Sequence, residues 1–270
     1  MKSFHEIFQT SQLVEDNSQI YVLDESWMQG RAIYGGLSTA LCLDGVKKQF
    51  ENLPPLRSVN VNFIGPASKE VFVKTKLLRQ GKSVAFVQAD LMGEAGLITS
   101  CVFSFGAARS SKLDAVFHKS EKLEGPESAD SFFEGNGSPS DSVGGQPAFT
   151  QHFDVRIVRG SRPFSGADDP SFELWVKHKD ASAKDIVALV ALADMPPPGV
   201  LPMLKSLAPI SSMSWMFNII QSDLTNDSGW WLMGVYAEHA REGYSSQNMY
   251  IHNDKGELVM VGRQNVAVFY

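Results

Sequence analysis

Ile33-Tyr34-Gly35-Gly36, running into Leu37–Phe50, is the stretch that decides the fold of this chain. The two glycines end an irregular segment, and the apolar residues that follow recur at helical spacing until Pro54-Pro55 forbids continuation. The spacing therefore predicts a long helix over about residues 36–51 that begins at the glycine pair.

Glycines at a helix start expose backbone N–H groups. With the positive end of the helix dipole behind them, such groups stabilise a carbonyl oxygen that becomes negative during acyl transfer. Gly35 and Gly36 are therefore candidate substrate-binding residues, with Tyr34 beside them. A structural interpretation stands next to this one, because glycines also let a helix pack closely on a sheet. The dipeptide alone leaves both open.

The composition argues against several classes of function. With 270 residues, of which 43% are apolar, the chain can bury one large core or two modest ones. The net charge of −6, without a Lys/Arg cluster longer than a pair, argues against a nucleic-acid partner. No segment has signal-peptide character or the length to span a bilayer, and the two cysteines, Cys42 and Cys101, are typical of a reducing compartment. We therefore expect a cytoplasmic protein without membrane insertion.

A run of predicted strands follows the helix. Stretches rich in β-branched and aromatic residues alternate with Gly, Pro and Lys turns at residues 58–63, 70–79, 83–92 and 97–105. One long helix followed by antiparallel strands is an α+β pattern, in which the helix packs on the sheet. Residues 106–150 are rich in Gly, Ser and Pro, and they predict a linker between two domains.

The pattern restarts after this linker. Ser182 and Asp185 predict a capped start for a helix over Ala183–Ala193, which ends before Pro196-Pro197-Pro198. Strands are predicted around it, at residues 151–159, 171–179, 211–219, 229–240, 244–252 and 258–269.

Two related turns support an internal repeat. Arg79-Gln80-Gly81-Lys82-Ser83 in the first half matches Arg241-Glu242-Gly243-Tyr244-Ser245 in the second, and each lies at the same strand–turn–strand junction. Three identities over five positions could arise by chance, but the order of elements also agrees on both sides. We therefore expect two similar domains, residues 1–105 and residues 151–270.

Several sequence segments carry a resemblance to a known family, and they are spread over nearly the whole chain except the linker. They are GRAIYGGLSTA, LRQGKSVAFVQADLMGEAGLITSCVFSFG, FELWVKHKD, ALVALADMP and VGRQNVAVF. In their order and spacing they resemble the tandem hotdog fold of the acyl-CoA thioesterase II type. The resemblance implies a double hotdog, in which each half has a long central helix wrapped by an antiparallel β-sheet.

The resemblance also implies a site. Such enzymes hydrolyse an acyl-CoA thioester with water, without a metal or bound cofactor, using an Asp near the end of the second-half helix, a hydroxyl residue on the next strand and a Gln on the last strand. Carried over, the Asp is Asp194 in ALADMP and the Gln is Gln264 in GRQN. The family usually has Thr at the hydroxyl position, where this chain offers Ser211 and Ser212 in PISSMSW. Strand alternation turns one of the two toward the site, and we favour Ser212.

Asp194 is a candidate functional residue even without the resemblance. It follows an apolar helix, where the dipole opposes a negative charge and burial raises the pKa of a carboxyl group. A carboxylate so placed is either poised as a base or is an exposed residue at a helix end. Gln264 has a structural alternative too, as an outward polar residue on an edge strand. The two residues in register favour the functional interpretation.

Signatures of other enzymes are missing from the sequence. It contains no G-x-S-x-G elbow, H-E-x-x-H, C-x-x-C or P-loop, and its six histidines are scattered singly, so none is assigned to catalysis. The hydratase branch of hotdog proteins needs a His five positions after an Asp, and no His has that spacing.

We therefore predict an acyl-CoA thioesterase of lipid metabolism. It would act on an acyl-CoA substrate, form a pseudo-dimer within one chain, and assemble further into a homodimer. Two alternatives stay open, a non-catalytic acyl-thioester binding protein of the same fold and a hotdog hydratase.

Overall fold

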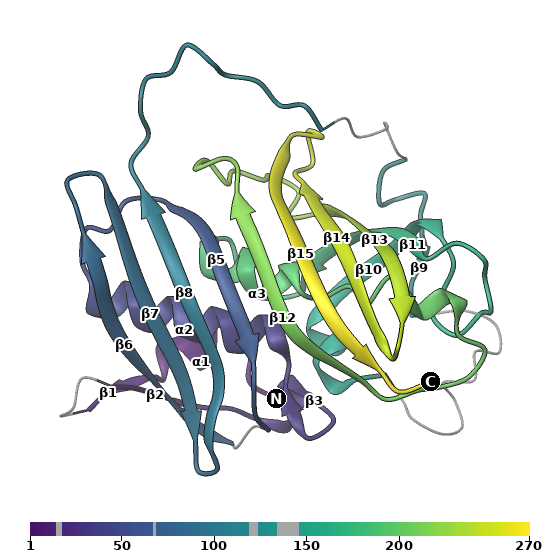
Figure 1. The fold of residues 1–270 in the computed structure, drawn as a ribbon, viewed down its shortest axis with the longest axis horizontal. Helices are drawn as coiled ribbons and strands as arrows, with labels where there is room; N and C mark the ends of the chain where they lie inside the picture. Colours follow the sequence, from purple (N-terminus) through teal and green to yellow (C-terminus); the bar gives the residue numbers. More distant parts are fainter. Residues whose placement is uncertain (15–17, 67–68, 119–123, 134–145) are drawn as a thin grey trace.

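The computed structural model describes residues 1–14, 18–66, 69–118, 124–133 and 146–270. They form a 13-stranded sheet with helices against one face and a separate two-stranded sheet of β3 (Met28–Gln29) and β4 (Ala32–Ile33) (Figure 1). Neighbouring strands in the 13-stranded sheet are antiparallel. The predicted α+β double hotdog is confirmed. The long strands are β5 (Leu56–Phe63), β6 (Glu70–Gln80), β7 (Val84–Gly93), β8 (Gly96–Gly106), β10 (Phe153–Gly160), β11 (Ser171–His178), β12 (Ile210–Ile219), β13 (Trp231–Arg241), β14 (Tyr244–His252) and β15 (Leu258–Val268).

The two halves join edge to edge. The strand order β6-β7-β8-β5 is followed directly by β12-β15-β14-β13, so the second set repeats the first in reverse across the β5–β12 pair. The two related turns join β6 to β7 and β13 to β14, as the repeat predicts. Trp215 of β12 pairs with Val61 of β5, and Phe217 with Val59, and all four side chains are buried. This seam makes the halves one continuous hydrophobic structure.

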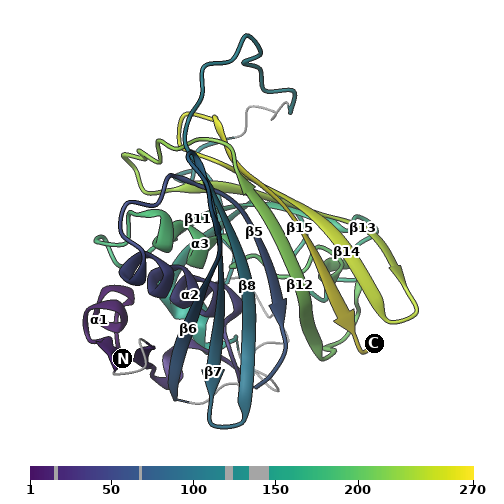
Figure 2. The same ribbon diagram turned by 60° about the vertical axis from the view of Figure 1, so that its left-hand side comes forward.

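The two main helices lie on the same side of the sheet (Figure 2). α2 (Gly35–Gln49) begins at the glycine pair as predicted, and its residues from Gly36 to Leu43 are buried all round. α3 (Ile186–Ala193) packs against α2. It starts later than predicted, because the Asp185 side chain accepts the N–H of Ala188 at 2.9 Å and caps the helix there. Ser182 is not the cap, since its hydroxyl and its N–H both donate to Asp180.

Part of the predicted linker packs against the second half. β9 (Asp130–Ser131) pairs with β10 and the side chain of Phe132 is buried there, whereas the buried Phe149 stacks on Tyr34 of the first half. The remaining elements are short: α1 (Phe4–Gln9), β1 (Gln12–Leu13), β2 (Gln19–Val22), η1 (Glu25–Trp27), β3 (Met28–Gln29), β4 (Ala32–Ile33), η3 (Ala148–His152) and η4 (Leu201–Met203). Cys42 and Cys101 are free and buried in the first half.

Candidate active site

Asp194 lies where the two halves meet. It is the C-cap of α3, and its own helix therefore presents the negative end of a dipole to it. The carboxylate nevertheless reaches the opposite end of the other helix: a Cβ placed on Gly35, the first residue of α2, would stand 2.5 Å from Oδ2 of Asp194. The backbone N–H of Gly36 hydrogen-bonds the same carboxylate. The N-terminus of α2 thus binds an anion supplied by the second half.

The glycine pair serves both interpretations drawn from the sequence. A Cβ on Gly36 would lie 2.3 Å from the carbonyl oxygen of Ala191, so this glycine is required for contact between backbones. The close contact is with α3, however, and not with the sheet. At Gly35 the nearest atoms belong to the side chains of Asp194 and Phe63, so this glycine makes room for the carboxylate.

Gln264 meets Asp194 from the sheet. Its Nε2 donates to Oδ1 of Asp194 at 2.8 Å, which joins the last long strand to the end of α3. The alternative of an outward residue on an edge strand is wrong, because β15 lies between β12 and β14 and the Gln264 side chain is only 2% exposed.

The protonation state of Asp194 is set by opposing effects. Burial raises the pKa of its carboxyl group to about 7, although the N–H groups of Gln264 and Gly36 favour the ionised form and oppose the rise. A carboxyl group with such a pKa exchanges its proton near neutral pH, which is the property required of a general base.

Tyr34 is placed beside this pair but is directed into the core. Its side chain is 1% exposed, its ring stacks on Phe149 with centroids 4.1 Å apart, and its hydroxyl donates to the carbonyl of Ala191 at 2.6 Å. Burial, together with the charge of Asp194, raises the pKa of the phenol well above its usual value, so it stays protonated. These contacts fasten α2 to α3, and the substrate contact proposed for Tyr34 stays a prediction.

Strand register separates the two serines. Ser212 pairs with Val266, which shares a face with Gln264, whereas Ser211 pairs with the alternate residue Ala267. Ser212 therefore projects from the face that carries Gln264, and Ser211 is exposed on the other. Within the described part of the chain, no side-chain hydrogen bond of either serine reaches Asp194 or Gln264. The position directly opposite Gln264 is occupied by the buried Trp215.

Gln247 is a member of this cluster that the sequence interpretation missed. It lies opposite Gln264 on β14, is 0% exposed, and donates from Nε2 to Oε1 of Gln264 at 2.9 Å. The available signal was its position in the strand, because Gln247 alternates with the apolar Met249 and Ile251 on the face that turns to the core.

Comparison with known proteins covers most of the chain. Residues 23–106 match the model of the acyl-CoA thioesterase N-terminal domain, and residues 126–268 match that of the C-terminal domain. The chain belongs to the acyl-CoA thioesterase family. No curated protein matched its sequence.

Solved structures share the fold of this acyl-CoA thioesterase family member. A conserved hotdog protein of unknown function from Alicyclobacillus acidocaldarius has a TM-score of 0.85 at 19% identity, with 100% of this chain and 99% of that one covered. An acyl-CoA thioesterase II from Mycobacterium marinum has a TM-score of 0.73 at 17% identity, with 98% of each chain covered. At these identities the likeness establishes the double hotdog fold.

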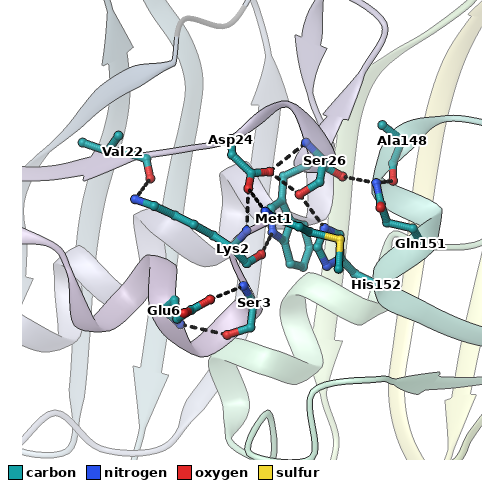
Figure 3. A network of polar contacts seen from close by, with 11 residues as sticks. Met1, Lys2, Ser3, Glu6, Val22, Asp24, Ser26, Ala148, Gln151 and His152 are labelled. Carbon is teal, nitrogen blue, oxygen red and sulfur yellow. Dashed lines mark hydrogen bonds and ion pairs between the residues drawn. The ribbon is translucent and has the colours of Figure 1, made fainter.

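A second polar cluster in this family member fastens the start of the chain (Figure 3). The carboxylate of Asp24 accepts hydrogen bonds from the backbone of Lys2 and from Ser26, and Ser26 Oγ lies 2.9 Å from Nε2 of His152 in η3. Burial lowers the pKa of His152 to about 4. Asp24 contacts the serine and not the imidazole, so the three groups lack the order of a Ser-His-Asp triad. We assign them to fastening the N-terminal segment onto the second half.

No helix in the described ranges is long and apolar enough to cross a bilayer.

Proposed function

We propose that this chain hydrolyses acyl-CoA thioesters to a carboxylic acid and CoA. The observation that carries the proposal is the position of Asp194, a carboxylate between the N-terminus of α2 and the amide of Gln264, with a pKa of about 7. Membership of the acyl-CoA thioesterase family supports the substrate class.

In this mechanism water is the nucleophile. Ionised Asp194 accepts a proton from the water as its oxygen attacks the thioester carbonyl carbon, and Gln264 holds the carboxylate in place. Ser212, on the same sheet face as Gln264, is the serine proposed to orient the water, with Ser211 as the less favoured choice.

The N-terminus of α2 supplies the electrostatic stabilisation of the reacting thioester. As the carbonyl oxygen gains negative charge, the positive end of the α2 dipole and the N–H of Gly35 stabilise it, while the N–H of Gly36 stays directed to Asp194. The tetrahedral intermediate then collapses, the carbon–sulfur bond breaks, and the proton held by Asp194 passes to the departing CoA thiolate. The step consumes one water and needs no metal or cofactor.

The six histidines do not support the hydratase alternative. In the parts of the chain that the structure describes, no hydrogen bond joins a histidine to Asp194 or Gln264. The cluster formed by Asp194, Gln264 and Gln247 therefore lacks the Asp–His pair that a hotdog hydratase needs.

The test is thiol release from a panel of acyl-CoAs of different chain length. We expect turnover by the wild type, a loss of roughly 10²–10⁴-fold in kcat for Asp194→Asn, and a smaller loss for Gln264→Ala, because the base contributes more than a group that orients it. Saturable acyl-CoA binding without thiol release would identify the non-catalytic binding protein. Wild-type turnover by Asp194→Asn would end the proposed mechanism and leave the fold untouched.

A further inference from the structure

A line of three hydrogen bonds leads from a fixed backbone donor to Asp194. The N–H of Gly199 donates to Oε1 of Gln247 at 2.7 Å, Nε2 of Gln247 donates to Oε1 of Gln264 at 2.9 Å, and Nε2 of Gln264 donates to Oδ1 of Asp194 at 2.8 Å. Gln247 and Gln264 are 0% and 2% exposed, so solvent does not offer them other partners.

The direction of this line follows from its first member. A backbone N–H can only donate, so Gln247 must turn its carbonyl oxygen to Gly199 and its NH₂ group to Gln264. Gln264 must then turn its own oxygen to Gln247 and its NH₂ group to Asp194. Gly199 is itself the first residue after Pro196-Pro197-Pro198 that has a backbone N–H, and this run restricts where the donor lies.

The orientation of Gln264 matters because its two ends have opposite effects. An NH₂ group facing Asp194 stabilises the carboxylate, whereas an amide oxygen there would favour the protonated acid. We propose that Gln247 is a positioning residue, which holds the NH₂ group of Gln264 toward Asp194 and so keeps Asp194 able to accept a proton from water. The inference rests on the proposed hydrolysis for its kinetic consequence, but the orientation itself does not depend on turnover.

The groups around Asp194 allow the effect of Gln247 on the pKa of Asp194 to be measured. Among the described groups that shift the pKa of Asp194 there is no charged side chain: β15 contributes the amide of Gln264 and α2 contributes the N–H of Gly36. Tyr34, from the segment before α2, is titratable but keeps its proton. A change in the pH dependence of activity on altering Gln247 can therefore be traced to the amide line.

The kinetic test uses Gln247→Met, which keeps the length of the side chain and removes its amide. We expect kcat to fall about tenfold with KM nearly unchanged, and the midpoint of the pH profile of kcat/KM to move upward by about half a unit or more, because Gln264 becomes free to turn. The matched control is Ser245→Ala, which alters the same face of β14 at a buried hydroxyl that has no partner among the described residues. The control is expected to behave as the wild type.

A double variant separates positioning from a general structural effect. If Gln247 acts through Gln264, then Gln247→Met adds less than about twofold to the loss caused by Gln264→Met. Independent effects that multiply in the double variant would overturn the inference. So would a Gln247→Met enzyme with the kcat and pH midpoint of Ser245→Ala.

A measurement on the wild type covers the case in which a variant does not fold. With glutamine side chains labelled with ¹⁵N, the NH₂ signals of Gln264 and Gln247 should both shift with the titration of Asp194, and both shifts should vanish in Asp194→Asn. A Gln247 signal that stays constant through the titration of Asp194 would overturn the inference. A wild type that releases no thiol but shows the coupled shifts would refute the proposed function and leave the orientation intact.

Discussion

At the scale of single residues, Asp194 lies between two helix ends of opposite polarity. It caps the C-terminus of α3, whose dipole disfavours a carboxylate, and it accepts the N–H of Gly36 at the start of α2, whose dipole favours one. Burial outweighs the hydrogen bonds, and the pKa of the carboxyl stands at about 7. Small changes around this residue therefore alter its charge at neutral pH.

The first prediction is a pH–rate profile. We expect kcat/KM for acyl-CoA hydrolysis to rise with pH through one ionisation with its midpoint at about 7 and then to level off, because only ionised Asp194 takes a proton from water. Initial rates of thiol release across neutral pH measure it. A flat profile through this range would contradict the role of Asp194 as base.

The same ionisation predicts a change in stability. The pKa of Asp194 is about 7 in the folded chain against the ordinary aspartate value of 3.8, so the folded state keeps a proton that the unfolded state has already lost. The free energy of unfolding of the wild type therefore falls as pH rises between these values. The free energy of unfolding of Asp194→Asn does not fall in this way, because asparagine has no proton to lose. Relative to the wild type, the variant should gain roughly 4 kcal/mol between about pH 4 and pH 8. Urea titrations at both pH values measure the gain, and a difference that does not change with pH would show an ordinary pKa.

The glycine pair allows a comparison of matched substitutions. Gly36→Ala places a Cβ against the backbone of Ala191, so we expect a loss of roughly 2 kcal/mol or more in stability. Gly35→Ala places a Cβ against the ends of the Asp194 and Phe63 side chains, which can shift, so we expect a folded protein with kcat reduced by about tenfold or more. Thermal unfolding and thiol release separate the two. If both variants lost activity in the same proportion to their loss of stability, both glycines would have only a packing role.

At the scale of elements, the site depends on how α2 meets α3. Tyr34 fastens this crossing with a buried hydrogen bond from its hydroxyl to Ala191 and with its stack on Phe149. Figure 1 shows α2 behind the strands of the first half and α3 behind β5 and β12 at the seam. The distance between Asp194 and the glycine turn is therefore a property of two helices from different halves.

Tyr34→Phe tests the fastening. The change keeps the stacked ring and leaves the carbonyl of Ala191 without its donor, so we expect a loss of about 1–2 kcal/mol in the free energy of unfolding. Chemical denaturation measures the loss, and KM for the best acyl-CoA tests the substrate contact. A raised KM at unchanged stability would assign Tyr34 to substrate binding, in place of the packing role its contacts support.

At the scale of the whole molecule, the β5–β12 seam turns two similar halves into one sheet. Trp215 and Phe217 on β12 are buried at the seam, whereas Met213 and Met216 on the same strand are 44% and 38% exposed. The first pair closes the pseudo-dimer, and the second leaves apolar surface near its centre.

We expect this chain to associate further into a homodimer, because hotdog sheets bury an additional edge or face and exposed apolar side chains lie near the seam. Light scattering at micromolar concentration should give twice the chain mass of 29.7 kDa. The mass of a single chain would remove the homodimer and leave the pseudo-dimer within the chain.

The sequence by itself determined the elements and their repeat. The glycine pair, the apolar helix after it and the alternating strands specify local structure through backbone sterics and periodicity, and these do not depend on distant residues. Asp194 and Gln264 are selected by the resemblance of ALADMP and GRQN to the family, and Asp194 also by its position at the end of an apolar helix. The predicted start of α3 is too early, because two capping residues compete within a few positions and tertiary packing decides between them.

Only the tertiary structure decided what surrounds Asp194. Judged within its own helix, the residue faces an unfavourable dipole, and the helix that favours its charge belongs to the other half of the chain. The same holds for Gln247. Its amide finds its two hydrogen-bond partners only when β14 pairs with β15 in register and Gly199 approaches from a loop. Electrostatics and hydrogen bonding act through space between residues far apart in sequence, so periodicity predicts which residues face inward but not which of them meet.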